Sequence, residues 1–197
     1  QRIIKRAMDL VLCGIAMIPA APVMLIIAAA IKIEDGGPVF YKQKRMTRGG
    51  REFEILKFRS MIVDAEKYAG AVLASEDDPR ITKVGKVIRA ARLDELPQLF
   101  NVLRGDMSFV GPRPEVQEYT DLYTEEQRQV RPGITGVASI RYRNENDLLA
   151  ASDDPNRTYI QEILPEKLRL DLSYIPRAGV VQDIALIFET LAVVIRG

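Results

Sequence analysis

Apolar residues dominate the first part of the chain. From Leu10 to Ile31 the sequence contains no charged residue, which makes an uncharged run of 22 residues. A straight helix of that length measures about 33 Å, and the hydrocarbon core of a bilayer is about 30 Å thick. The run therefore predicts a helix that associates with a membrane.

Two prolines divide this apolar run. Pro19 and Pro22 each remove a backbone donor, so a sharp kink is expected near its middle. Lys and Arg occur on both sides of the run, and the positive-inside rule therefore favours the cytoplasm for both ends. These residues leave two topologies open: a helix that spans the membrane, and a bent, re-entrant helix that enters and leaves on one side.

The hydrophobic period changes after the apolar run. Gly49 and Gly50 mark a turn, and apolar and polar residues alternate over residues 52–61, which predicts a hairpin with the strand-like run that begins at Pro38. Basic residues are frequent here, and most of them are expected to face solvent or lipid headgroups. Lys57 and Arg59 lie inside an apolar stretch, which makes them better candidates for binding a phosphate group.

Beyond the hairpin, the spacing of apolar residues is helical. It predicts helices over residues 63–73, 82–92, 94–104, 160–174 and 180–195. For the helix over residues 94–104, Asp94 is a suitable N-cap and Gly105 a suitable stop. The fold class is therefore expected to be mainly α with a short β-hairpin, with amphipathic helices at the membrane interface.

Composition narrows the chemistry. The 197 residues carry a net charge of +1, with no His and a single Cys. A zinc site built from Cys and His and an internal disulfide are both excluded, and the usual side chain for proton transfer near neutral pH is missing. Any bound metal is expected to be a hard ion such as Mg²⁺. The balanced charge argues against nucleic acid as a partner.

Asp94 and Glu95 are the main candidates for chemistry. In an arbitrary protein, two acids at a helix start most often form a cap. Here Arg89 and Arg92 precede them, and Arg113 follows in a proline-stiffened loop. Acids that hold Mg²⁺ and arginines that hold phosphate oxygens suit a metal–diphosphate substrate. A carboxylate can also attack phosphorus and form an acyl phosphate, which requires no histidine.

At this point the chain resembles a known family, the monotopic phosphoglycosyl transferases, also called bacterial sugar transferases. The matching segments are KRAMDLVL, GPVFYKQKR, FEILKFRSM, ARLDELPQLFNVLRGDMSFVGPRPE, VRPGITG and LRLDLSYI. The run from Arg92 to Glu115 is the most specific of them. The resemblance implies transfer of a sugar 1-phosphate from a UDP-sugar to undecaprenyl phosphate, with release of UMP, to initiate glycoconjugate assembly.

The resemblance also implies roles for individual residues. Asp94 matches the nucleophile that carries a covalent phospho-sugar intermediate, and Glu95 matches its acidic partner, so that the pair would hold Mg²⁺. Further substrate or phosphate contacts are implied at four positions, namely Lys57, Arg89, Arg113 and Asp171.

For topology, the resemblance favours the re-entrant helix, kinked at Pro19 and Pro22, over residues 1–33. Residues 34–197 would form one membrane-associated catalytic domain at the cytoplasmic face of the bacterial inner membrane. Membrane lipid is an expected partner, and a homodimer is possible. The segment over residues 141–166 is longer than in the family's smallest members, and the sequence does not identify the sugar or the pathway.

Two other functions compete with this one. A membrane-anchored scaffold with a basic, lipid-binding surface would account for the apolar run, but it leaves the acid pair and the glycine- and proline-bearing loops without a purpose. A glycosyltransferase that uses a polyprenyl-linked acceptor would release UDP. Analysis of the nucleotide product therefore separates it from a phosphoglycosyl transferase.

Overall fold

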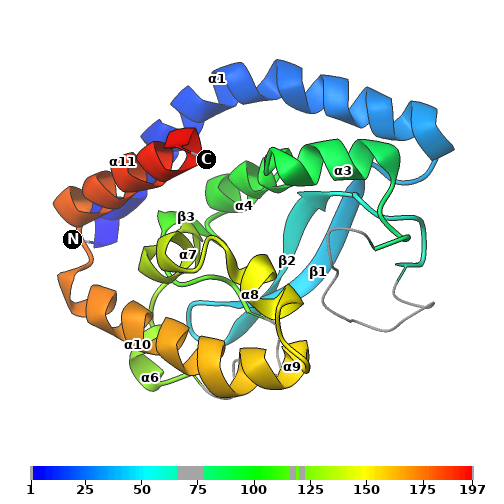
Figure 1. The fold of residues 1–197 in the computed structure, drawn as a ribbon. Coiled ribbons are helices and arrows are strands. Elements are labelled where there is room, and N and C mark those ends of the chain that lie inside the picture. Colours follow the sequence, from blue (N-terminus) through cyan, green and yellow to red (C-terminus); the bar gives the residue numbers. More distant parts are fainter. Residues whose placement is uncertain (1, 66–77, 116–118, 120–122, 197) are drawn as a thin grey trace.

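The computed structural model describes residues 2–65, 78–115, 119 and 123–196. Over these residues the chain is mostly helical, with a small two-stranded antiparallel sheet and one long apolar helix at its N-terminal side (Figure 1). This confirms the predicted mainly α class with a short β-hairpin. Most of the helix predicted over residues 63–73 lies outside the described residues.

The N-terminal helix α1 runs from Arg2 to Asp35 and continues through Pro19 and Pro22. In this structure α1 forms one arch along an edge of the molecule (Figure 1), and the sharp kink at the two prolines stays a prediction. A proline costs a helix one hydrogen bond, and packing on a common core keeps the flanking turns together. Along the inner side of α1, five apolar residues are buried, namely Cys13, Ala20, Met24, Ile27 and Ile31.

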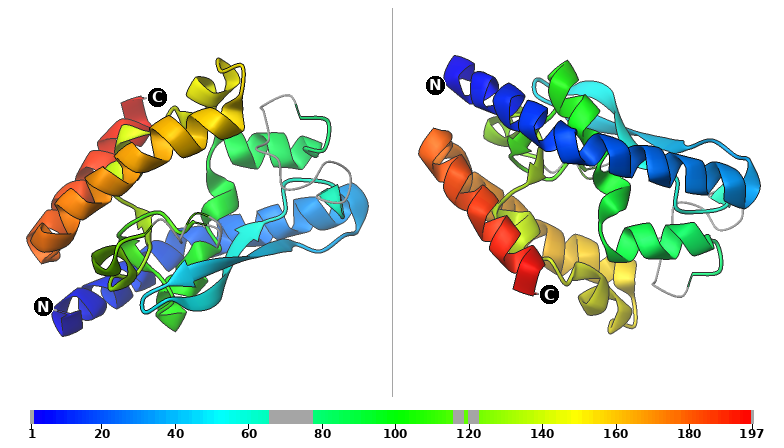
Figure 2. Two further views of the ribbon diagram at one scale, coloured as in Figure 1. Left: turned by 90° about the horizontal axis from the view of Figure 1, so that it is seen from below. Right: turned by 90° about the horizontal axis from the view of Figure 1, so that it is seen from above.

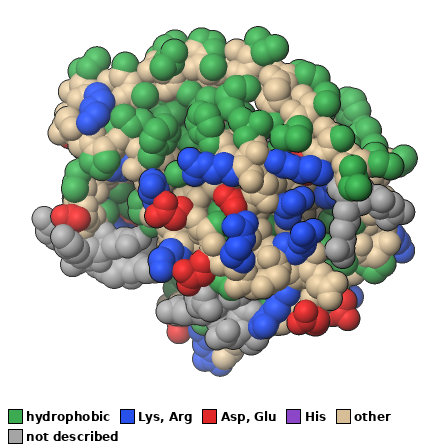
Figure 3. Space-filling view, turned by 180° about the vertical axis from the view of Figure 1, so that it is seen from behind, with side chains coloured by type: hydrophobic (Ala, Val, Ile, Leu, Met, Phe, Trp, Pro, Cys, Tyr) green, Lys and Arg blue, Asp and Glu red, His purple; other side chains and the backbone are tan. Residues whose placement is uncertain are grey.

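The outer face of α1 is apolar as well. It exposes large side chains along its length, including Val11, Ile15, Ile18, Leu25 and Ile26. By length and composition, α1 is the one helix among the described residues that could cross a membrane. In Figure 3 apolar side chains gather over the upper edge of the molecule, where α1 runs, and Lys and Arg side chains lie below them.

The predicted hairpin is confirmed. Strands β1 (Phe40–Thr47) and β2 (Arg51–Phe58) pair antiparallel, with Phe40 opposite Phe58. Gly49 and Gly50 in the turn have φ angles of 78° and 69°, a left-handed conformation that glycine adopts without strain. β2 buries Phe53 and Ile55 in the core that also receives the inner side of α1.

A helix, a tight turn and a second helix follow the segment that is not described. Helix α3 (Lys83–Ala90) is capped by the hydroxyl of Thr82, the 3₁₀ turn η1 covers Leu93–Glu95, and α4 covers Gln98–Arg104. The prediction of Asp94 as a helix N-cap was wrong, because Asp94 lies within η1 and Pro97 precedes α4. Gly105 ends α4 with a φ of 87°, as predicted.

A pair of short parallel strands was not predicted. Strand β3 (Ser108–Val110) pairs with β4 (Gly133–Thr135), so that the loops after Val110 and before Gly133 lie side by side. Glycines permit this approach: a Cβ atom on Gly133 would lie 2.1 Å from the Gly111 nitrogen, and one on Gly111 would lie 2.4 Å from the Arg131 carbonyl oxygen. Three-residue strands give little local signal, so only tertiary packing reveals them.

The second half of the chain is helical. It comprises α6 (Glu125–Arg128), α7 (Val137–Arg141), α8 (Glu145–Ala150), α9 (Pro155–Thr158), a π-helical turn η2 (Tyr159–Ile163), α10 (Leu164–Tyr174), the 3₁₀ turn η3 (Ile175–Arg177) and α11 (Val180–Arg196). The helices predicted over residues 160–174 and 180–195 are thus confirmed. α10 and α11 both pack against α7, on a side of the molecule away from the hairpin (Figure 2).

Polar contacts hold α1 at both ends. Near its start, Lys5 pairs with the fully buried Asp183 of α11, and Arg6 donates to the carbonyl oxygens of Val102 and Leu103 at the end of α4. Both carbonyls belong to the last turn of α4, where the Val102 oxygen also accepts from the Gly105 nitrogen at 3.0 Å, and the positive charge of the arginine complements the negative end of the helix dipole.

At the other end of α1, the carboxylates of Glu34 and Asp35 are engaged. Glu34 accepts from the backbone nitrogens of Lys83 and Val84 at the start of α3, where a negative charge complements the helix dipole. Asp35 pairs with Arg59 at the end of β2. The apolar helix is thereby fixed to the elements that carry the acid pair.

Candidate active site

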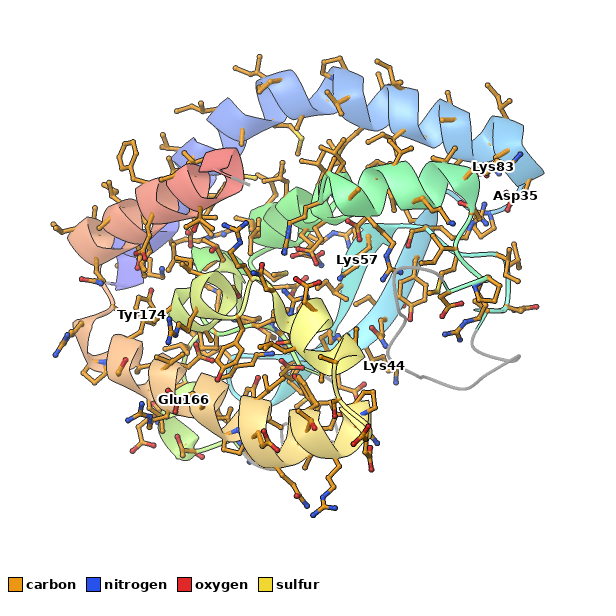
Figure 4. The ribbon with its side chains drawn as sticks, viewed as in Figure 1. Asp35, Lys44, Lys57, Lys83, Glu166 and Tyr174 are labelled. Atoms are coloured by element: carbon orange, nitrogen blue, oxygen red, sulfur yellow. The ribbon has the colours of Figure 1, made fainter. Side chains whose placement is uncertain are left out.

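The acid pair lies in the tight turn between α3 and α4. Arg92, just before the turn, has a φ of 54°, a left-handed conformation that a side chain with a Cβ rarely adopts. Glu95 Oε1 lies 2.8 Å from Lys57 Nζ and 3.6 Å from an Arg113 nitrogen. The structure thus brings together residues from β2, η1 and the loop after β3, and Lys57 lies below α3 in Figure 4.

Glu95 is held in its charged form. Burial by itself disfavours the carboxylate, but the charges of Lys57, Arg113 and Arg92 and the hydrogen bond from Lys57 outweigh burial and lower the pKa of Glu95 to about 2. In return, the charge of Glu95 raises the pKa of Arg113. Glu95 is therefore an anion under all ordinary conditions, and its oxygens are available to a cation.

Asp94 has different surroundings. Burial and the neighbouring Glu95 charge raise its pKa above the ordinary value, and Lys57 and Arg89 offset only part of this effect. Within the described ranges Asp94 forms no ion pair. A carboxylate that is desolvated and free of an ion-pair partner is more nucleophilic than one in an ion pair, because no paired cation withdraws electron density from its oxygens.

Lys57 owes its position to a residue that the sequence did not single out. The fully buried side chain of Asn101, on α4, accepts a hydrogen bond from the Leu56 nitrogen at 2.9 Å and donates one to the Glu54 oxygen at 2.7 Å. This two-bond clamp fixes α4 against β2 immediately before Lys57. An Asn in the middle of a predicted helix is the only sequence signal, because most helix-interior positions that face a core are apolar.

Arg113 is positioned by the glycines of the β3–β4 pair. It follows Pro112 in the loop after β3, and the Pro112 oxygen accepts a hydrogen bond from Gly133 at 2.8 Å. The sequence runs GPRP and RPGITG therefore lie against each other, and the first of them brings the guanidinium of Arg113 to Glu95.

Arg59 and Asp171 lie in other networks. Arg59 is buried and donates to both Asp35 oxygens, at 2.5 and 2.6 Å, and to the carbonyl oxygens of Pro38 and Met61. The described contacts thus give it a structural role between α1 and β2. Asp171, on α10, is buried beside Lys167, and the structure does not bring it into contact with the acid pair.

A second buried cluster of charges adjoins Arg113. Lys167 is 3% exposed, lies 3.2 Å from Glu115 and 3.0 Å from Glu145, and stands 5.0 Å from the centre of the Tyr159 ring. Tyr159 begins the π-helical turn and donates to Glu115 at 3.0 Å. Sequence analysis did not identify this cluster, because its members come from segments far apart in the chain. The charges of Glu115 and Glu145 raise the pKa of Arg113, which also pairs with Glu95. The cluster is thereby linked electrostatically to the acid pair.

Two pockets open on either side of Arg113. The smaller, of about 40 Å³, is lined by Arg45, Lys57, Glu95 and Gln98 in addition to Arg113 and Glu115. The larger, of about 250 Å³, lies between the hairpin turn, the loop that carries Arg113, and α6. A ligand that occupied both would pass over Arg113.

Metal ligands among the described residues are few. They include no group of three or more acids, Cys or His that could hold a metal ion. Asp94 and Glu95 offer two carboxylates that are adjacent in the sequence at the site. This set suits Mg²⁺, which commonly takes one or two carboxylates from a protein and completes its shell with phosphate oxygens and water.

Comparison with known proteins identifies the family. The model of the family described as bacterial sugar transferase matches residues 1–197, and the chain belongs to this family. It is 40% identical to a UDP-N-acetylgalactosamine-undecaprenyl-phosphate N-acetylgalactosaminephosphotransferase of Aeromonas hydrophila, over 98% of this chain and 44% of the relative.

Relatives from other bacteria carry similar names. The chain is 36% identical to a UDP-glucose:undecaprenyl-phosphate glucose-1-phosphate transferase of Caulobacter vibrioides, over 95% of this chain and 68% of the relative. It is 38% identical to the protein of the same name from Escherichia coli, over 97% of this chain and 40% of the relative. The chain thus spans less than half the length of the Aeromonas and E. coli proteins.

Proposed function

We propose that this chain transfers a sugar 1-phosphate from a UDP-sugar to undecaprenyl phosphate and releases UMP. Membership of the bacterial sugar transferase family supports the reaction class, and the names of three relatives support the two substrates. The observation that carries the mechanism is the contrast within the acid pair. Glu95 is paired with Lys57 and Arg113, and Asp94 is free of an ion pair with any described residue.

The reaction proceeds in two displacements. A carboxylate oxygen of Asp94 attacks the phosphorus that bears the sugar, the bond from that phosphorus to the bridging oxygen breaks, and UMP leaves with the electron pair. The product is an acyl phosphate, in which Asp94 carries the sugar phosphate as a mixed anhydride. An oxygen of undecaprenyl phosphate then attacks the same phosphorus and displaces the Asp94 carboxylate, which is thereby regenerated. Lys57 and Arg113 neutralise charge on the phosphate oxygens, and Arg89 acts on the charge of Asp94.

Mg²⁺ is the cofactor of this proposal. Glu95 would hold it, with an oxygen of Asp94 as a second ligand, and the ion would supply positive charge to the diphosphate. The low pKa of Glu95 keeps one ligand charged whether or not the substrate is present.

The apolar faces of α1 and α11 are proposed to enter one leaflet from the cytoplasmic side. Alongside the outer face of α1, α11 exposes Val181, Phe188 and Leu191. Apolar surface of this extent is costly in water and favourable in lipid. The acid pair lies beneath α1, where the phosphate of a long polyprenyl lipid is within reach. On this proposal residues 1–33 form a re-entrant element and residues 34–197 the catalytic domain.

Adduct formation tests the reaction. Purified protein, UDP-sugar labelled in the sugar, and Mg²⁺ are mixed without polyprenyl phosphate, and the expected result is labelled protein with an equal amount of UMP. Asp94→Asn should abolish both products, because a neutral amide does not form the acyl phosphate. Glu95→Gln should slow turnover by roughly a hundredfold or more, the size seen for loss of one charged active-site group.

The control is Asp153→Asn, which alters an exposed acid outside the site and should leave adduct formation unchanged. Labelled adduct in Asp94→Asn would overturn the assignment of the nucleophile. Release of UDP in place of UMP would overturn the reaction class.

A further inference from the structure

Arg45 is a half-buried cation in the wall of the small pocket, and its role is not explained by the contacts it makes. It lies on β1 opposite Phe53 of β2. One of its terminal nitrogens donates to Gln43 Oε1 at 2.6 Å. Its Nε atom is buried and has no hydrogen-bond partner among the residues that the structure describes. A buried guanidinium donor without an acceptor is unfavourable, so this atom is a place where a ligand oxygen would bind.

The charges around Arg45 favour an anion. Burial lowers the pKa of Arg45, and the nearby Glu115 opposes this effect without cancelling it, while Arg113 adds repulsion. Glu115 is already shared with Lys167 and Tyr159. The pocket therefore joins Arg45, Arg113 and Lys57 on walls that leave room for a small group, and an entering anion would relieve the repulsion between the two arginines.

Arg45 lies farther along the hairpin than Lys57, because Lys57 pairs with Tyr41 and Arg45 follows Tyr41 by four positions on β1. Lys57 lowers the pKa of both Asp94 and Glu95, whereas the charged neighbours that affect the pKa of Arg45 most are Glu115 and Arg113. In a diphosphate, the phosphorus that is attacked must reach Asp94, and the other phosphate lies one bridging oxygen away. A cation that is displaced from the acid pair but shares its pocket is suited to that second phosphate.

We propose that Arg45, in the pocket that it shares with Lys57, Glu95 and Arg113, binds the phosphate that leaves as part of the nucleotide monophosphate. This inference rests on the proposed function and adds a residue to its donor site. Arg45 binds the nucleotide phosphate in the first displacement and has no role in the second.

The test compares UMP with uridine. Equilibrium binding of each is measured for the unmodified protein, Arg45→Gln and Arg45→Lys, with Lys44→Gln as the matched control. Lys44 is the neighbouring cation on the same strand, 79% exposed and paired only with Glu52 among the described residues. Arg45→Gln should weaken UMP binding by roughly tenfold to a hundredfold and leave uridine binding unchanged. The UMP affinity of Arg45→Lys should lie between those of the unmodified protein and Arg45→Gln. Lys44→Gln should bind UMP as tightly as the unmodified protein.

The two displacements give a second readout. In Arg45→Gln the KM for the UDP-sugar in adduct formation should rise, while transfer from preformed adduct to undecaprenyl phosphate should keep its rate. Unchanged UMP affinity in Arg45→Gln would overturn the inference and leave ordered water as the partner of Nε. Equal losses for uridine and UMP, or an equally slowed second displacement, would also overturn it, because they indicate a structural role.

A measurement on the unmodified protein covers the case in which Arg45→Gln does not fold. The ¹⁵Nε–H signal of Arg45 should shift when UMP is added and stay in place when uridine is added, and a signal that does not respond to UMP would contradict the inference. If the unmodified protein forms no adduct and binds no UMP, the proposed function itself fails. Adduct formation with unaltered behaviour of Arg45→Gln defeats only the role of Arg45.

Discussion

Asp94 and Glu95 are adjacent in the sequence, and their surroundings shift the two pKa values in opposite directions. Lys57 and Arg113 lower the pKa of Glu95 to about 2, whereas burial and the charge of Glu95 raise the pKa of Asp94. One acid is therefore a permanent anion, and the other is the less stabilised carboxylate. Such a separation of pKa values in a pair of acids is a feature of sites in which the two have distinct tasks.

Asp171 permits a prediction about pH. Burial, together with the charge of Glu115 and against that of Lys167, raises its pKa from 3.8 to about 7. The folded state thus prefers protonated Asp171, and this contribution to stability is complete below the ordinary pKa and is lost as the pH rises to about 7. The free energy of unfolding should fall between pH 5 and pH 8, by roughly 2 to 3 kcal/mol from this group.

Asp171→Asn should remove most of that dependence, because the amide does not titrate. Urea unfolding followed by circular dichroism at the two pH values measures it, with Asp153→Asn as the control that keeps the original slope. An identical slope in Asp171→Asn would show that other groups produce the pH dependence.

At the scale of elements, short strands and turns align the side chains of the site. The Asn101 clamp fixes β2 on α4, and the parallel β3–β4 pair fixes the loop of Arg113. None of these elements is stable alone: β3 and β4 have three residues each, and η1 is a single turn. Their order comes from the core that α1, β2 and α4 share.

Gly133→Ala tests the contribution of the β3–β4 pair. The added Cβ would lie 2.1 Å from the Gly111 nitrogen and 2.5 Å from the Thr135 oxygen, which are backbone atoms that cannot move independently. The substitution should lower the free energy of unfolding by about 3 kcal/mol or more and reduce adduct formation, since Arg113 moves with its loop.

Gly14→Ala is the matched control, because a Cβ there meets no atom within 4 Å and alanine favours a helix. Its stability should be unchanged or slightly higher. Equal thermal midpoints for the two variants would contradict the close approach of the two loops.

At the scale of the whole molecule, the fold separates an apolar edge from a polar body. α1 arches along that edge, its inner side buried and its outer side exposed, and polar residues tie both of its ends to α3, α4 and α11 (Figures 1 and 3). A helix fixed at both ends to a body on one side of a membrane has both of its ends on that side. This arrangement supports the proposed re-entrant topology.

Labelling from the two sides of the membrane tests this topology. Ile3→Cys and Lys44→Cys place thiols at exposed positions before and after the apolar run. A membrane-impermeant maleimide should modify both in inverted vesicles and neither in intact spheroplasts. The unmodified chain is the control, because Cys13, its only cysteine, is buried. Modification of Ile3→Cys in spheroplasts would establish a spanning helix.

The sequence by itself determined the features that depend on local pattern. The length of the apolar run, the glycines of the hairpin turn and the helical spacing of residues 82–92, 160–174 and 180–195 predicted elements that the structure confirms. Hydrophobic period and turn chemistry act over a few residues, so one sequence is enough to read them. The motif around Asp94 likewise predicted the family, and the comparisons confirm it.

Tertiary structure decided what depends on approach between distant segments. In the folded chain Asp94 lies in a 3₁₀ turn and not at a helix cap, and α1 is continuous through its prolines. Arg59 forms an ion pair with Asp35. Tertiary structure also produced the Asn101 clamp and the Lys167 cluster. Burial and nearby charge set a carboxylate's electrostatics, and both are supplied by residues far away in the sequence.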